Sequence, residues 1–139
     1  MKVVIIGGVA GGASAAARLR RLDESAEIVM VERTGYVSYA NCGLPYYVGG
    51  VIADRAELTL QTPERFRERF NIDVRVGSEV AAINREAKTV SVREAETGRI
   101  YEEPYDKLIL APGAASVVPA AVSLDSPRVF TLRTVEDAL

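Results

Sequence analysis

A lone cysteine lies in a segment that suits redox chemistry. Cys42 is the one cysteine in 139 residues and lies between Asn41 and Gly43. Pro45 follows shortly after and suits the first turn of a helix. A helix N-terminus favours the thiolate, which is the form of cysteine that attacks sulfur electrophiles. A buried, inert thiol is the alternative interpretation, but the polar and glycine neighbours favour a reactive one.

A glycine loop near the N-terminus could bind a dinucleotide. Residues 7–12 read GGVAGG, in which Gly7 and Gly12 take the first and third places of the fingerprint GxGxxG. Val9 replaces the second glycine, which normally lets the backbone approach a pyrophosphate. The context supports the motif, because Glu32 ends the next strand 20 residues after Gly12, where an acid can accept from ribose hydroxyls. A glycine turn without nucleotide is the alternative.

Composition restricts the possible functions. A net charge of −2 gives little attraction to nucleic acid, and no apolar stretch reaches the roughly 18 residues of a membrane-spanning helix. The absence of histidine excludes histidine acid–base chemistry and histidine metal sites, and we expect no metal. The N-terminus lacks the apolar region of a secretory signal. The sequence therefore predicts a cytoplasmic protein without nucleic-acid or membrane partners.

The elements that must position these residues follow an α/β pattern. We expect a strand at Lys2–Ile6, a helix over residues 13–22 and a strand over 27–32, which together form one βαβ unit. A shaped loop with a short helix follows over 35–50. Thr62 is the expected N-cap of a helix that ends near Phe70.

The second half of the chain reads mainly as short strands. After a strand over 72–76, we expect an antiparallel meander over 79–84, Thr89–Glu94 and 99–103. A buried strand over 108–110 runs into a glycine turn at 111–114. The tail is expected to form a strand over 129–132 and the first turn of a helix over 134–139.

Four segments resemble one family of flavoenzymes. They are GGVAGGAS at 7–14, SYANCGLPYY at 38–47, QTPE at 61–64 and YDKLILAPGA at 105–114. They are similar to the N-terminal part of the single-cysteine pyridine nucleotide-disulfide oxidoreductases, namely coenzyme A-disulfide reductases and NADH-dependent persulfide reductases. The resemblance implies an α/β fold over 1–139: an incomplete, Rossmann-like FAD-binding domain whose parallel sheet carries an inserted antiparallel meander. The NAD-binding and dimerisation domains of the family are not expected in this chain.

The resemblance also implies roles for particular residues. The implied FAD-binding positions are Gly7, Gly11, Gly12, Glu32, Arg33, Val80 and Gly113. Cys42 matches the catalytic nucleophile beside the flavin. The implied coenzyme A positions are Ser14, Arg18, Arg21, Ser38 and Asn41.

The coenzyme A positions have an alternative explanation and one departure. Ser14, Arg18 and Arg21 fall at i, i+4 and i+7, which is one helical face, but an ordinary solvated face would show the same spacing. A basic residue that the family has at Phe70 is absent. Arg67 or Arg69 is a candidate substitute.

The resemblance implies an FAD-dependent enzyme that uses NADH or NADPH to reduce coenzyme A disulfide or persulfide through Cys42, as a homodimer. Related NADH peroxidases carry a histidine where this chain has Ala10, which disfavours peroxide as the acceptor. An NADH oxidase of the same superfamily and a non-catalytic flavin- or nucleotide-binding module stay open as alternatives. These 139 residues alone are expected to be inactive and to retain FAD weakly or not at all.

Overall fold

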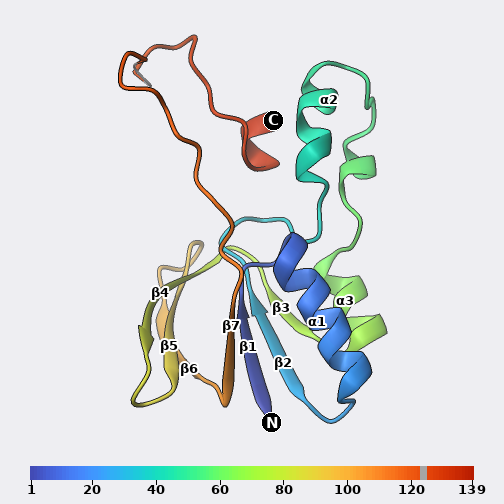
Figure 1. The fold of residues 1–139 in the computed structure, drawn as a ribbon, viewed down its shortest axis with the longest axis vertical. Coiled ribbons are helices and arrows are strands. Elements are labelled where there is room, and N and C mark those ends of the chain that lie inside the picture. Colours follow the sequence, from blue (N-terminus) through green and yellow to red (C-terminus); the bar gives the residue numbers. More distant parts are fainter. Residues whose placement is uncertain (123–124) are drawn as a thin grey trace.

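The computed structural model describes residues 1–122 and 125–139, which form an α/β fold around a parallel sheet (Figure 1). The sheet has four strands in the order β3-β2-β1-β7, and every neighbouring pair is parallel. Their bounds are β1 (Lys2–Ile6), β2 (Glu27–Val31), β3 (Asp73–Arg75) and β7 (Lys107–Leu110). The predicted fold class is thereby confirmed.

Each face of this sheet is covered by a different layer. Two helices, α1 (Ala10–Leu22) and α3 (Pro63–Phe70), cover one face (Figure 1). An antiparallel meander of β4 (Ser78–Asn84), β5 (Thr89–Glu94) and β6 (Ile100–Pro104) covers the other. Side chains alternate along a strand, so Val3 and Ile5 of β1 pack toward the helices while Val4 packs toward the meander. This double covering explains the continuous apolar run in β1.

A third group of elements lies beyond the carboxyl ends of the strands. It contains α2 (Leu44–Val48) and three short 3-10 helices, η1 (Asn41–Gly43), η2 (Arg55–Leu58) and η3 (Glu136–Ala138). Leu44, Leu58 and Val135 are buried together, which joins these elements into a small core of their own. In Figure 1 the C-terminal η3 therefore lies next to α2. Within residues 1–122 and 125–139, no helix is long and apolar enough to span a membrane.

The helix after the glycine loop begins earlier than predicted. It starts at Ala10 rather than at residue 13, so that Gly11 and Gly12 form its first turn. Glycine has a low helix propensity, which is why the sequence pattern places the start after the loop. The helix is held instead by packing, since Ala13 and Ala16 are buried against the sheet.

The predicted strand over residues 129–132 is wrong. No described strand pairs with this stretch, and the side chain of Phe130 is 83% exposed. A β-branched and aromatic run favours a strand only where a partner offers a ladder of hydrogen bonds. The rest of the tail ends in η3, where Val135 is 1% exposed.

A buried carboxylate ties the meander to the parallel sheet. Glu103 of β6 is 6% exposed and accepts from Lys2 of β1 at 2.5 Å and from Arg75 of β3. Burial raises the pKa of Glu103, but hydrogen bonds from Lys2 and Arg75 and their positive charges outweigh burial, so the pKa lies below its ordinary value. The same interactions, with Tyr101 and Asp73, raise the pKa of Arg75 despite desolvation. These three side chains therefore fix how the two sheets meet.

We predict that Glu103→Gln lowers the free energy of unfolding by about 1–3 kcal/mol at neutral pH, because two partly buried cations lose their counter-charge. Since the pKa of Glu103 is lowered, its contribution is present above the ordinary carboxyl pKa and is lost as the pH falls through the folded value. Urea unfolding of variant and unmodified chain should thus converge in acid. The exposed neighbour Glu102 supplies the matched control, and an equal loss in Glu102→Gln would contradict the role of Glu103.

Candidate functional site: a dinucleotide trench that reaches Cys42

The glycine loop packs backbone against backbone. Gly7 has φ +95°, and a Cβ added to it would lie 2.1 Å from the carbonyl oxygen of Ala111. A Cβ on Gly12 would lie 1.8 Å from the carbonyl oxygen of Gly7. No side chain fits at either place. The loop therefore seats the start of α1 directly on the end of β1 and on the turn that follows β7.

The replacement of the second fingerprint glycine is compatible with this loop. Val9 is the N-cap of α1, and its φ of −93° is negative, so the backbone there is not in the left-handed region that favours glycine. The structure describes every residue of α1; no side chain caps its N-terminus, and no acidic residue lies in its first turn. The first backbone N–H groups and the positive end of the helix dipole are therefore available to an anion such as a pyrophosphate.

Glu32 follows β2 and braces the loop. Its side chain is 7% exposed. Oε2 accepts from the N–H of Gly8 at 2.8 Å, and Oε1 accepts from the N–H and hydroxyl of Thr34, both at 2.9 Å. A carboxylate has about four acceptor sites, so these bonds leave capacity for a ligand hydroxyl. The ribose-binding role of Glu32 stays a prediction.

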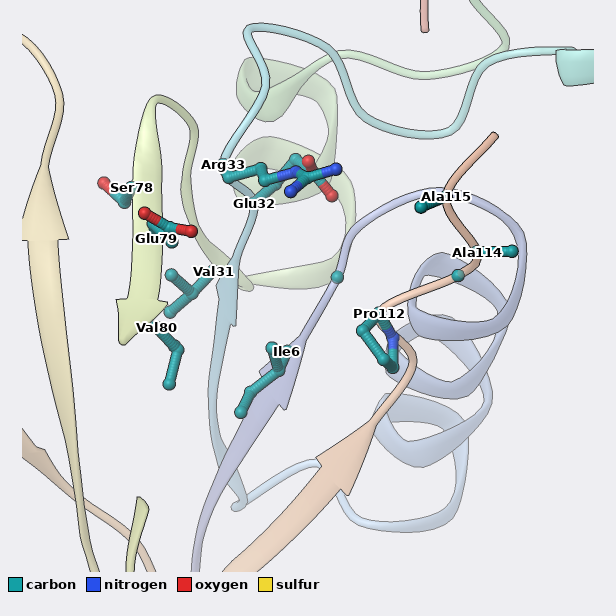
Figure 2. Close-up of a pocket in the computed structure, with 12 residues that line it drawn as sticks. Ile6, Val31, Glu32, Arg33, Ser78, Glu79, Val80, Pro112, Ala114 and Ala115 are labelled. Carbon is teal, nitrogen blue, oxygen red and sulfur yellow. The ribbon is translucent and has the colours of Figure 1, made fainter. Parts of the chain in front are cut away.

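A cavity opens at the carboxyl ends of β1 and β2 (Figure 2). Its volume is about 330 Å³. Figure 2 shows Val80 of β4, Ile6 of β1 and Pro112 after β7 around it, with Glu32 and Arg33 at its rim. Five of the predicted FAD-binding residues line it: Gly7, Glu32, Arg33, Val80 and Gly113.

A second cavity of about 570 Å³ continues the first. Five residues line both cavities, namely Glu32, Arg33, Pro112, Gly113 and Ala114. The second cavity also includes Gly11, and it ends at Asn41 and Cys42. We call the two cavities together the trench. Gly12 lines neither of them, because it lies buried under Gly7.

Cys42 lies at the far end of the trench in η1, directly before α2. Its side chain is exposed and free of any disulfide. The neighbouring Gly43 is buried, and a Cβ there would lie 2.9 Å from Leu58. The packed glycine thus holds the turn while Cys42 is exposed, so in this chain Cys42 is not part of a buried core.

A groove between α1 and α3 joins the trench from the other side of the loop. Its volume is about 380 Å³, and the wall on α3 includes Phe66 and Phe70. Ser14 and Ser38, two of the predicted coenzyme A positions, line this groove. The groove and the trench have four walls in common, namely Val9, Ala10, Tyr39 and Leu60. The groove and the cavity that contains Cys42 therefore lie next to each other.

The predicted arginines lie outside the groove. Arg18 and Arg21 are exposed on α1 and line no described cavity. Of the two candidate substitutes for the missing basic residue, the Arg69 guanidinium lies 5.6 Å from the centre of the Phe70 ring, whereas Arg67 pairs with Asp73 at 3.8 Å. Asn41 lies with Cys42 in the trench rather than in the groove.

Sequence reasoning missed several residues of the trench. Arg133 lines it, and its Nε donates to the carbonyl of Ala114 at 2.9 Å. Buried Tyr39 separates trench from groove; burial raises the pKa of Tyr39, and the charges of Glu32 and Glu136 add to this effect. Arg133 belongs to no local motif. It reaches the trench only because the C-terminal segment folds back onto the turn after β7, where Ala114 lies.

These features define a dinucleotide-binding α/β protein with an accessible thiol at the end of its cofactor trench. The chain belongs to the pyridine nucleotide-disulphide oxidoreductase family, whose model matches residues 1–139. This result confirms the predicted family and, at the level of the family, its dependence on FAD and on NADH or NADPH.

Known relatives share the whole of this chain but extend well beyond it. The chain is 46% identical over 136 residues to coenzyme A disulfide reductase of Staphylococcus aureus (strain Newman), covering 98% of this chain and 30% of that protein. It therefore spans about a third of this curated relative. The structure of reduced CoADR-RHD from Bacillus anthracis gives a TM-score of 0.95 at 56% identity, over 99% of this chain and 25% of that one.

Two further structures differ in the reaction that their names state. An NAD-dependent persulfide reductase from A. fulgidus gives a TM-score of 0.92 at 40% identity, over 99% of this chain and 26% of that one. A water-forming NADH oxidase from Lactobacillus brevis also gives 0.92, at 30% identity, over 99% of this chain and 30% of that one. The fold is thus common to relatives whose names state different reactions.

We predict that Gly12→Ala destabilises the chain by about 2 kcal/mol or more, since the new methyl group would overlap the Gly7 carbonyl. Gly11→Ala is the matched control, because its Cβ would meet only Ala111 Cβ, at 3.4 Å. Alanine in a helix is favoured over glycine, so the control should be neutral or slightly stabilising. Thermal unfolding of both variants tests this, and equal midpoints would contradict the packing argument.

Proposed function

We propose that this chain supplies the first, FAD-binding segment of an oxidoreductase that uses NADH or NADPH to reduce coenzyme A disulfide or a coenzyme A persulfide at Cys42. One observation carries the proposal. The trench contains Cys42 and borders the groove at Ala10 and Tyr39, so a cofactor in the trench and a thiol ligand in the groove would lie next to each other, with Cys42 on the trench side.

The residues of the trench fit FAD. The uncapped N-terminus of α1 offers N–H groups to a pyrophosphate, and the cavity around Val80 and Glu32 suits the adenosine end. The flavin end would then lie toward Asn41 and Cys42. The assignment of Gly7, Gly11, Glu32, Arg33, Val80 and Gly113 as contacts belongs to this proposal, with Gly12 acting through the loop.

Cys42 would act as the nucleophile. Its thiolate attacks one sulfur of coenzyme A disulfide, a mixed disulfide with Cys42 forms, and one coenzyme A thiolate leaves. FAD held in the trench would supply two electrons from NADH or NADPH, and reduction of the mixed disulfide would release the second coenzyme A and restore the Cys42 thiolate. With a persulfide the same attack leaves the outer sulfur on Cys42, and reduction releases it as sulfide. This chain contributes the nucleophile, its exposure and the orientation of the site.

The groove between α1 and α3 fits the body of coenzyme A. Ser14 and Ser38 offer hydroxyls beside an apolar wall, which suits a long amide-containing arm. Arg18, Arg21 and Arg69 lie around α1 and the end of α3, where guanidinium groups suit phosphates. If these arginines bind the phosphates of coenzyme A, the nucleotide end of coenzyme A lies outside the groove.

Oxygen is the competing acceptor, since an NADH oxidase shares this fold. Ala10 lines both groove and trench and offers no acid–base group for peroxide chemistry. A non-catalytic flavin-binding module would need an inert Cys42, whereas this thiol is exposed. Cytoplasmic location and assembly as a homodimer stay predictions.

We predict that Cys42→Ser in the complete protein abolishes NADH consumption with coenzyme A disulfide or persulfide while flavin stays bound, because serine keeps the volume but not the nucleophile. NADH consumption with ferricyanide, an acceptor that needs no thiol, is the internal control and should persist. Retained activity toward coenzyme A disulfide would contradict the mechanism. Oxygen uptake at a comparable rate without any thiol substrate would favour the oxidase instead.

The nucleotide end of coenzyme A can be tested separately. We predict that Arg21→Gln raises the KM for coenzyme A disulfide about 5- to 10-fold and leaves the KM for pantethine unchanged, because pantethine has the same arm without phosphates. Arg85→Gln, an exposed arginine in the turn between β4 and β5, is the matched control. Equal changes for both substrates would show that Arg21 does not recognise phosphate.

A further inference from the structure

Arg20 makes an unusual set of hydrogen bonds at the end of α1. Its Nε donates to the carbonyl of Phe70 at 2.7 Å, and its Nη2 donates to the carbonyl of Asn71 at 2.9 Å. Its Nη1 donates to the carbonyls of Glu24 at 2.6 Å and Asp23 at 3.3 Å. Four carbonyls from two chain segments thus share one half-buried guanidinium.

These carbonyls belong to the C-terminal ends of two helices. Phe70 is the last residue of α3, and Asn71 is its C-cap in the left-handed conformation, with φ 48°. Asp23 is the C-cap of α1. Carbonyls at a helix C-terminus lack helical partners and carry the negative end of the dipole, so a planar cation between two such ends satisfies both. Arg20 therefore fastens the end of α3 to the end of α1.

The groove lies between the same two helices. Ala13, Ala17 and Arg20 follow one another at i, i+4 and i+7, so Arg20 continues the face of α1 that lines the groove. The opposite wall contains Phe66 and Phe70, whose rings lie 6.0 Å apart. Arg20 bonds to the backbone of Phe70, the last residue of that wall. The distance between the walls thus depends on the guanidinium.

We propose that Arg20 is a positioning residue that sets the width of the groove and thereby the affinity for the thiol substrate. It acts through Phe70 and α3 rather than by contact with the substrate. This inference rests on the proposed function, because it takes the groove as the coenzyme A site. The planar fork matters more than the charge, since a lysine ammonium cannot span carbonyls on two helices.

The test uses the complete, flavin-loaded protein with Arg20→Lys and, as matched control, Arg85→Lys. We expect Arg20→Lys to raise the KM for coenzyme A disulfide and the KM for pantethine alike, each about 3- to 10-fold. The KM for NADH and the rate with ferricyanide should stay unchanged. Both substrates should respond because the arm they share lies in the groove. An Arg20→Met variant, which keeps the apolar stem without donors, should raise both KM values further.

A second measurement does not depend on the substrate. Hydrogen exchange of the amides near residues 19–24 and 67–72 should speed up in Arg20→Lys and not in Arg85→Lys. Faster exchange together with unchanged KM values would overturn the inference, as would unchanged exchange. If the unmodified protein reduces neither thiol substrate, the proposed function fails. Faster exchange in Arg20→Lys would then still show that Arg20 holds the two helix ends together. The proposed role of Arg20 in substrate affinity would be overturned together with the function.

Discussion

The close approach of three backbone segments at the glycine loop is the constraint on which the rest of the structure depends. The carbonyl of Gly7 occupies the space where a side chain of Gly12 would be, and the carbonyl of Ala111 does the same for Gly7. The end of β1, the first turn of α1 and the turn after β7 are thereby locked together within van der Waals distance. A side chain at either glycine would separate them, and the uncapped start of α1 would no longer face the trench.

The site follows from where these segments meet. Parallel strands present their carboxyl ends at one edge of the sheet, and both the loop after β1 and the turn after β7 leave from that edge. Glu32 leaves from the same edge after β2 and holds the loop through the N–H of Gly8. The walls that the two cavities of the trench share are therefore made of segments that directly follow β2 and β7. Its far end is different, because Cys42 lies on short helices held by the separate core of Leu44, Leu58 and Val135.

The contrast between the trench and its far end at Cys42 agrees with what the relatives of the chain have in common. Proteins named as a coenzyme A disulfide reductase, a persulfide reductase and an NADH oxidase share the fold over nearly the whole chain. One fold can carry sites for several different reactions. Differences in the acceptor are then expected around the groove between α1 and α3, whose wall on α3 does not belong to the glycine loop, and at Ala10. Arg20 connects the two walls of that groove and so joins its shape to the helices of the scaffold.

The sequence by itself determined what depends on local spacing. Hydrophobic periodicity located β1, α3 and the meander, the fingerprint located Gly7 and Gly12, and the segment around Cys42 marked the thiol, because each signal lies within a few neighbouring residues. Only the tertiary structure decided what depends on distant partners. The stretch over 129–132 has strand propensity but gains no partner strand, so it forms none. Likewise Arg133 reaches the trench, Phe70 reaches the groove and Glu103 reaches Lys2 only after long loops close, and no local pattern encodes such a meeting.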